Sequence, residues 1–410
     1  MTVDGELIPH LFRTEYRKIV SVLCRRFGFA QAEIAEDIAS ETFLTAAQTW
    51  GVQGVPENPV AWLYTVAKNK AKNHLKHQQI FDDTVSPELR SAPPGGDEPD
   101  IDLSPQSIND SQLQMMFAIC HPGIPPEAQI GLSLRILCGF GIDEIADAFL
   151  TSKETINKRL FRAREKLRQL NIPIALPGPS EIDGRLSTVL TTIYLLFNEG
   201  YYSVSHNTTL RKDLCLEAMR LCMMLIENPE TDTPPANALI SLMCFHASRF
   251  DARFDSNGSM VLYDDQDTSL WNSDLIRKGM YFLHRAQRGN VISKYHLEAA
   301  IAYWHTQKVD TNEKWESILQ LYDQLLEIEY SPMAALNRTY ALAKARGKEF
   351  AIREAEKLNL TDNHLYYALL GELNTGIDRE RAKREFEQAL TLARTETDKR
   401  TIRRKIDRLG

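Results

Sequence analysis

The sequence predicts an all-α protein of 410 residues. Apolar residues recur at three- and four-residue spacing over most of the chain, as in helices that bury one face. No segment shows the period-two alternation typical of half-buried strands. Pro, Gly and Asn interrupt the helical pattern at intervals, which indicates short helices joined by turns. We expect two small helical domains, 8–81 and 106–172, joined by an acidic flexible linker, 82–105, and followed by a helical-hairpin array over 181–410.

Composition and charge restrict the possible functions. The apolar content of 43% is ordinary for a globular protein, and the net charge is −7. Any nucleic-acid contact must therefore come from local basic patches. This favours a protein that acts inside a larger complex over one that binds DNA tightly by itself. No apolar run approaches a membrane span, and the N-terminus MTVDGELIPH lacks a secretory pattern. The lack of a long apolar run predicts no membrane partner. Six cysteines without C-x-x-C spacing are expected to be reduced and buried, which predicts a cytoplasmic location.

An acidic amphipathic helix is expected over residues 33–50. Asp37 and Glu41 lie one turn apart on its polar side, and taken alone they indicate a solvated face. Its apolar stripe consists of Ile34, Ile38, Phe43 and Ala46.

A second, basic helix is expected over 59–77, with Pro59 at its first position. Cations, amides and aromatics together suit single-stranded nucleic acid, because cations hold the backbone, aromatics stack on bases and amides read base edges. A solvated lysine face beside core aromatics is the alternative. The packing side is Leu63, Val66, Ala67, Ala71 and Leu75; the polar side is Lys68, Asn69, Lys72, Asn73 and Lys76, with Trp62 and Tyr64 at the start.

Residues 141–168 indicate a helix, a tight turn and a second helix, the arrangement of a helix-turn-helix that places its second helix in a DNA major groove. Thr151 or Ser152 is expected to cap the second helix, and Glu154 fits a capping box with Thr151. A basic surface helix without a DNA role is the alternative. The apolar residues of the first helix are Ile142, Ile145, Ala146 and Phe149. The second helix is expected to bury the stripe Ile156, Leu160, Ala163 and Leu167. A different arc of its surface carries Thr155, Lys158, Arg159, Arg162 and Lys166.

The last third of the chain is repetitive. Residues 315–347 and 364–393 each indicate a helix, a turn and an Ala-rich or Leu-rich second helix. A period in the mid-thirties suggests tetratricopeptide-like hairpins, although generic helical hairpins have a similar pattern. Stacked hairpins form a solenoid with a concave binding face.

No catalytic, cofactor or metal site is predicted. The pairs His74 and His77, Cys120 and His121, and Cys244 and His246 do not supply four ligands at zinc spacing. Residues 263–267 are acidic but lack the order of a calcium loop. Phosphate-loop and nucleophile-elbow motifs are missing from the sequence, so we expect no enzymatic activity.

The ordered segments resemble a bacterial sigma factor of the extracytoplasmic-function (ECF) type. The acidic helix carries Glu36, Asp37, Glu41, Thr42, Phe43 and Trp50; PVAWLYTVAKNKAKNHL is similar to regions 2.3 and 2.4; and LSLRILCGFGIDEIADAFLTSKETINKRLFRAREKLR is similar to region 4. The segment MMFAICHPGIPPEAQIGLSLR and FNEGYY at 197–202 resemble a subgroup with a long tetratricopeptide-like extension.

The resemblance implies that core RNA polymerase, through its β′ clamp helices and β flap, and promoter DNA are the partners. Polymerase binding would fall to Asp37, Glu41, Phe43 and Trp50. The −10 element would meet Asn58, Trp62, Asn69 and Asn73 at bases and Lys68, Lys72 and Lys76 at phosphates. The −35 element would meet Ser152, Lys153, Glu154, Thr155, Lys158, Arg159, Arg162 and Lys166.

Two further roles follow from the resemblance. The acidic linker would thread the nucleic-acid channel of the polymerase through Asp82, Asp83, Glu88, Asp97, Glu98, Asp100 and Asp102, or would serve only as a tether. The C-terminal extension would control promoter or polymerase engagement in cis, or recruit a protein partner. Asn198, Glu199, Tyr201 and Tyr202 would contact the sigma domains or cap a helix end.

Two other functions fit the same motifs. One is a helix-turn-helix regulator that acts without polymerase, and the other is a tetratricopeptide scaffold whose basic helices are incidental. The basic 59–77 helix beside its acidic neighbour favours the sigma factor, because a simple repressor needs neither.

Overall fold

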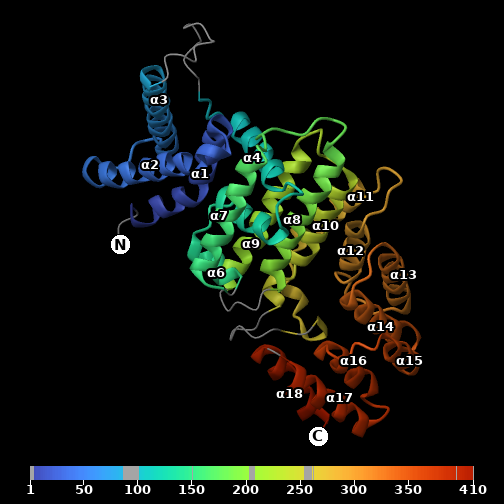
Figure 1. The fold of residues 1–410 in the computed structure, drawn as a ribbon. Coiled ribbons are helices and arrows are strands. Elements are labelled where there is room, and N and C mark those ends of the chain that lie inside the picture. The colour runs from blue at the N-terminus through green and yellow to red at the C-terminus, as the bar shows by residue number, and fades with distance from the viewer. Residues whose placement is uncertain are drawn as a thin grey trace. The chain divides into compact units, whose positions relative to one another are not determined.

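The computed structural model describes residues 4–85, 101–149, 151–202, 208–253, 261, 263–393 and 395–409. Within these residues the chain forms helices and turns and contains no β-strand, so the all-α prediction is confirmed. The chain divides into two compact units, Met1–Gly200 and Tyr201–Gly410. Figure 1 shows the helices coloured in chain order from the N-terminus to the C-terminus.

The first unit is organised around its long first helix. This helix, α1, packs against α2, α3, α4 and η3, and it buries Ile19, Leu23 and Cys24 completely. The described elements of the unit are α1 (Asp4–Phe27), η1 (Phe29–Gln31), α2 (Ala32–Gln53), α3 (Pro59–Val85), α4 (Pro105–Ile119), α5 (Pro126–Leu132), η3 (Ser133–Leu137), α6 (Ile142–Ala148), α7 (Lys153–Gln169) and α8 (Ile182–Tyr202).

The two predicted N-terminal domains are joined in this single unit. Arg17 of α1 is buried, and its guanidinium donates to the carbonyl oxygen of Cys138 at 3.5 Å. Arg25 of the same helix reaches the hydroxyl of Ser111 on α4, also at 3.5 Å. Polar and apolar contacts of α1 thus connect the region before the linker to the region after it.

Two predicted boundaries differ from the structure. Helix α3 continues to Val85, so Asp82 and Asp83 belong to a helix and not to the linker. Helix α8 groups with the first unit up to Gly200, whereas we expected a boundary near 181. The reason is side-chain packing: the hydroxyl of Thr192 on α8 donates to Gln129 on α5 at 2.6 Å, and Arg185 donates to the carbonyl oxygen of Phe117.

The linker is described only in part. Glu88, Asp97, Glu98 and Asp100 lie outside the described residues. Asp102 accepts hydrogen bonds from the backbone N–H and the hydroxyl of Ser104, at 2.8 and 2.9 Å, and Ser104 in turn caps α4.

The second unit is a succession of helices, each packed on its neighbours in sequence. Its described elements are α9 (Thr208–Glu227), α10 (Pro234–Ala247), η4 (Phe250–Ala252), η5 (Tyr263–Asp265), η6 (Thr268–Leu270), α11 (Ser273–Ala286), α12 (Lys294–Trp304), α13 (Asn312–Ile328), α14 (Pro332–Arg346), α15 (Lys348–Leu358), α16 (His364–Asn374), α17 (Arg379–Leu392) and α18 (Glu396–Leu409).

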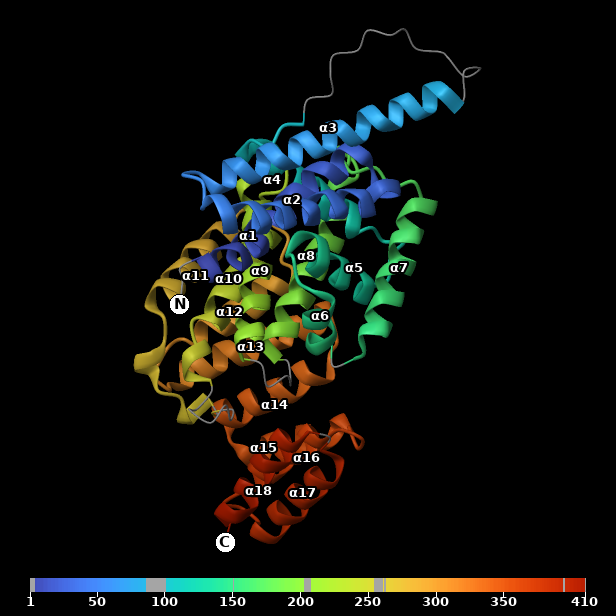
Figure 2. The same cartoon turned by 90° about the vertical axis from the view of Figure 1, so that its left-hand side faces the viewer.

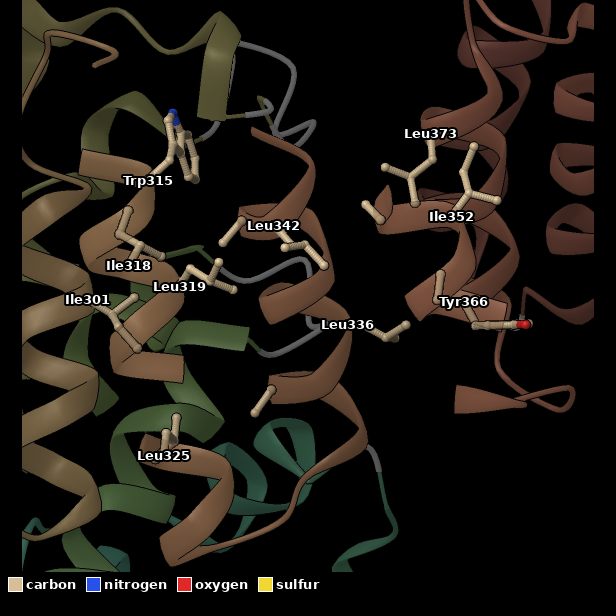
Figure 3. Close-up of a cluster of buried hydrophobic side chains, with 14 of the residues drawn as sticks. Ile301, Trp315, Ile318, Leu319, Leu325, Leu336, Leu342, Ile352, Tyr366 and Leu373 are labelled. Atoms are coloured by element: carbon tan, nitrogen blue, oxygen red, sulfur yellow. The ribbon is translucent and has the colours of Figure 1, made fainter. Parts of the chain in front are cut away.

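One continuous apolar core runs through α12 to α16. Figure 3 shows side chains of α13 and α14, among them Leu319 and Leu342, in the space between the two helices. The two hairpins expected at 315–347 and 364–393 are present as α13 with α14 and as α16 with α17. At the second pair Gly371 permits close contact, because a Cβ there would lie 2.7 Å from the ring of Phe386.

Candidate nucleic-acid and polymerase interface

The recognition helix α7 has the two-sided character that the sequence predicts. Its apolar stripe, Ile156, Leu160, Ala163 and Leu167, is buried, with 4% exposure at most. Figure 2 shows α7 as a long helix that follows α6 after a short turn. The exposed side chains on the remaining surface include Ser152, Lys153, Glu154, Thr155, Lys158, Arg162 and Lys166, all of them expected at the −35 element.

A single serine caps the N-terminus of α7. The hydroxyl of Ser152 accepts from the backbone N–H of Thr155 at 3.2 Å, which makes Ser152 the N-cap residue. The capping box expected between Thr151 and Glu154 is therefore wrong, because with Ser152 as the cap Glu154 stands at the second helical position. The corresponding side-chain contact occurs at α6, where the carboxylate of Glu144 accepts from the N–H of Gly141 at 2.7 Å.

Two of the cations expected to face DNA have partners within the protein. Lys153 pairs with Asp143 of α6 at 2.5 Å, and this hydrogen bond raises the pKa of the lysine. Arg159 is half-buried, with its guanidinium carbon 5.4 Å from the ring centroid of Phe149. Both contacts connect the two helices of the motif and position the N-terminal turns of α7.

The opposite face of α7 carries arginines that sequence reasoning left without a role. Arg164 forms an ion pair with Glu36 of α2, and Arg135 approaches the same carboxylate at 3.8 Å. Arg168 donates to the carbonyl oxygen of Ala30 at 3.4 Å. Helical periodicity places Arg164 and Arg168 away from the DNA arc, but it does not reveal that Arg164 is largely covered by α2, whereas Arg168 stays exposed.

Helix α3 lies against α1 and α2 (Figure 2). Asn69, Asn73 and Lys76 are exposed on α3, and Lys68 and Lys72 are half-buried. Of the predicted packing side, Leu63, Ala67 and Ala71 are completely buried, and Val66 and Leu75 are half-buried.

The aromatic and amide side chains at the start of α3 take part in local structure. Trp62 is half-buried, with its ring 5.3 Å from that of Trp50. Tyr64 donates to the carboxylate of Glu15 at 2.5 Å and so is held within the fold. Asn58 is exposed, and its side-chain oxygen accepts from the N–H of Ala61 at 3.0 Å, capping the helix.

The polar face of α2 presents Asp37 and Glu41 to solvent, and Glu41 pairs with Lys70 of α3 at 3.0 Å. Phe43 and Trp50, which we expected to contact polymerase, are 5% and 6% exposed. That expectation is corrected, because Phe43 packs against Phe12 and Trp50 against Trp62 in the core. Sequence reasoning missed Leu44, which is 58% exposed one turn beyond Glu41.

The described residues contain no cluster of three or more potential metal ligands. Among the same residues, no helix combines the length and the apolarity needed to cross a bilayer. All six cysteines are free and buried, as expected.

Comparison with known proteins places these surfaces in two known regions. Residues 11–80 match the family described as Sigma-70 region 2, and residues 120–167 match Sigma-70, region 4. Residues 185–287 match a family of unknown function, DUF6596.

Three relatives are informative. An uncharacterized protein of Rhizobium meliloti is 32% identical over 387 residues, which covers 93% of this chain and 91% of that protein. An ECF RNA polymerase sigma-E factor of Haemophilus influenzae is 25% identical over 40% of this chain and 88% of its own length. An RNA polymerase sigma-H factor of Pseudomonas aeruginosa is 27% identical over 38% of this chain and 82% of its own. No solved structure matches the chain.

Proposed function

Because this chain belongs to the ECF-type sigma factors, with regions 2 and 4 followed by a C-terminal DUF6596 region, we propose that it binds core RNA polymerase and directs it to promoters with defined −10 and −35 elements. The exposed basic arc of α7 over its buried apolar stripe carries this proposal. The family is not enzymatic, so the polymerase supplies the chemistry and this chain supplies recognition.

Each element has a proposed surface. The N-terminal turns of α7 read the −35 element in the major groove, where arginine suits guanine and Arg162 and Lys166 approach phosphates. The exposed Asn69, Asn73 and Lys76 of α3 engage the −10 strand. The polar face of α2, with Asp37, Glu41 and the exposed Leu44, meets the β′ clamp helices, and region 4 meets the β flap.

Simultaneous reading of both elements requires the two regions to separate. The −10 and −35 elements are separated by roughly 25 base pairs, which corresponds to ~85 Å along B-DNA at ~3.4 Å per base pair. A compact unit of about 200 residues has a radius of gyration of only ~16 Å. Because Arg164 of α7 contacts Glu36 of α2 in this structure, the described arrangement is a closed state that must open on the promoter.

The C-terminal region is proposed to be a tetratricopeptide-like array that controls polymerase engagement in cis or recruits a protein partner. Its support is the continuous core through α12 to α16, which links successive helices as a solenoid does.

In vitro transcription with purified core polymerase tests the proposal. The full chain and residues 1–200, cut where the compact units divide, are each assayed on a library of promoter fragments. We expect start sites that depend on the added chain and a change in activity on truncation. Absence of promoter-dependent transcripts from either form would refute the sigma assignment, and identical transcription from both would refute control by the C-terminal region.

A further inference from the structure

The second unit contains buried cations that the sigma function does not use. Arg249 and Arg253 follow α10, and Lys314 lies in the first turn of α13; they are 9%, 8% and 2% exposed. We refer to these three residues as the cationic cluster. Burial of a charge costs several kcal/mol unless charge or hydrogen bonds compensate for it.

Aromatic rings hold the cluster together. The guanidinium carbon of Arg253 lies 3.7 Å from the ring centroid of Tyr201, in the FNEGYY segment. The ring of Tyr263 has Arg249 at 5.4 Å and Lys314 at 5.5 Å, so two cations share one ring. Trp271 lies 6.3 Å from the same ring. Tyr201, in a segment whose role the sequence left open, is thus part of a cation–aromatic assembly.

Arg249 has no anionic partner among the described residues. Its Nε–H is buried without a hydrogen-bond acceptor, and no ion pair of its side chain occurs in that part of the chain. The indole N–H of Trp271 is likewise buried without an acceptor. The two residues are neighbours in space, because the N–H of Asn272 donates to the carbonyl oxygen of Ser248 at 2.8 Å.

Three described carboxylates close in sequence have other partners. Asp251 pairs with Lys212 at 2.6 Å. Asp267 accepts from the N–H of Ser269 at 2.8 Å. Asp310 lies 3.8 Å from Lys314 and 3.7 Å from Lys344, so its one charge is shared between two lysines. None of these pairs supplies an acceptor for Arg249 or Trp271.

The buried histidines beside the cluster respond to this positive field. Burial is the main cause, and Arg249 with Lys314 adds to it, in lowering the pKa of His305 to about 3. The pKa of His246 is lowered well below its ordinary value by burial and then by Arg249 and Arg253. Both imidazoles are therefore neutral at pH 7 and stand beside the guanidinium of Arg249.

We propose that the second unit binds a small oxyanion at the cationic cluster, with the guanidinium of Arg249 and the indole N–H of Trp271 as donors. A planar guanidinium fork is suited to phosphate and carboxylate oxygens, and burial restricts the ligand to a small one. The C-terminal region is then a receptor for an anionic effector, which goes beyond promoter recognition.

Binding is tested on the purified full chain, without polymerase or DNA, so that its failure is separate from failure of the sigma assignment. Inorganic phosphate and, in a second arm, sodium malonate are titrated against sodium chloride of equal ionic strength. The readouts are the melting temperature and tryptophan emission. Wild type is compared with Arg249→Met, Arg249→Lys and the surface control Arg277→Met on α11, whose side chain is 70% exposed.

We expect a saturable rise in melting temperature with at least one anion for wild type and Arg277→Met. Arg249→Met should lower the affinity by about tenfold or more, and Arg249→Lys by less, because it keeps the charge but loses the fork. If Arg249→Met does not fold, Trp271→Phe replaces it, with an expected loss of affinity and of the emission change. No saturable response of wild type to either anion, or an equal response of the Arg249 or Trp271 variants, overturns the proposal.

Discussion

Arg164 on the inner face of α7 forms an ion pair with Glu36 of α2, across 128 residues of sequence. Both side chains are largely buried, with 17% and 14% exposure. The pair joins α7, the helix proposed to read the −35 element, to the region 2 module proposed to carry the −10 and polymerase surfaces. It is thus a point at which opening of the closed state can be measured.

Reversal of one charge in this pair should open the unit. Arg164→Glu places two carboxylates together and should weaken docking by about 2 kcal/mol. Spin labels at Gln48→Cys and Gln169→Cys report the distance between α2 and α7, since all six native cysteines are buried. We expect longer distances in Arg164→Glu and recovery in the double variant with Glu36→Arg. Lys158→Glu, on the exposed face, is the control, and an unchanged distribution in Arg164→Glu would contradict the role of the pair.

The outer face of α7 should dominate the salt dependence of DNA binding. Arg162→Ala should weaken −35 binding by about tenfold and lower the slope of log K against log salt by about 1, because one phosphate contact is lost. Arg168→Ala is a matched control on the same helix, since Arg168 contacts Ala30. Fluorescence anisotropy at several salt concentrations measures both. Equal slopes for Arg162→Ala and wild type would remove Arg162 from the interface.

The cap of α7 should depend on Ser152 and not on Thr151. Ser152→Ala removes the acceptor for the N–H of Thr155 and should lower the free energy of unfolding by about 1 kcal/mol. Thr151→Ala should change it by about 0.5 kcal/mol or less. Urea unfolding followed by circular dichroism distinguishes the two, and a larger loss in Thr151→Ala would reverse the assignment.

Close packing of α16 on α17 should require Gly371. Gly371→Ala places a methyl group 2.7 Å from the buried ring of Phe386 and should cost about 1–3 kcal/mol. Gly184→Ala on α8 is the matched control, because a Cβ at this position meets no atom within 4 Å. The higher helix propensity of alanine should raise the free energy of unfolding by about 0.5–1 kcal/mol. Denaturant unfolding measures both. If Gly371→Ala left the free energy of unfolding unchanged, α16 and α17 could move apart without loss of stability, and the required close packing would be contradicted.

Acid should destabilise the second unit through His305. Burial and the charges of Arg249 and Lys314 lower the pKa of His305 to about 3 in the folded state. In the unfolded chain the pKa of a histidine is about 6.5. The contribution of neutral His305 to the free energy of unfolding is therefore fully present above about pH 6.5. It is lost as the pH falls from that value towards 3. The expected loss is roughly 1 kcal/mol per pH unit for this group. Urea unfolding between pH 7 and 4.5 should show a shallower dependence for His305→Gln than for wild type or for His10→Gln, an exposed control.

Much of the fold follows from local pattern. The spacing of Ile156, Leu160, Ala163 and Leu167 predicts which face of α7 is buried, and the structure confirms it. The basic helix that begins at Pro59 is also confirmed, although it continues to Val85 and not to residue 77. Helical periodicity converts spacing into a face without knowledge of the partner, which is why these predictions are reliable.

The site depends more strongly on contacts between distant segments. Phe43 and Trp50 fit an interface motif, yet both are buried, because Phe12 and Trp62 cover them. Tyr64, which the sequence groups with stacking aromatics, donates to Glu15, 49 residues earlier. No local pattern distinguishes an aromatic ring that meets a base from one that meets the core.

The order of residues along the chain was sufficient to determine the all-α class, the helix-turn-helix and the charged arcs, since these depend on periods of three to four residues. Only the tertiary structure decided that Arg164 meets Glu36, that region 2 and region 4 form one unit, and that Arg249 is buried without a described anion. The physical reason is that burial and charge pairing are properties of surfaces in contact, and a contact between segments a hundred residues apart leaves no periodic trace in either segment.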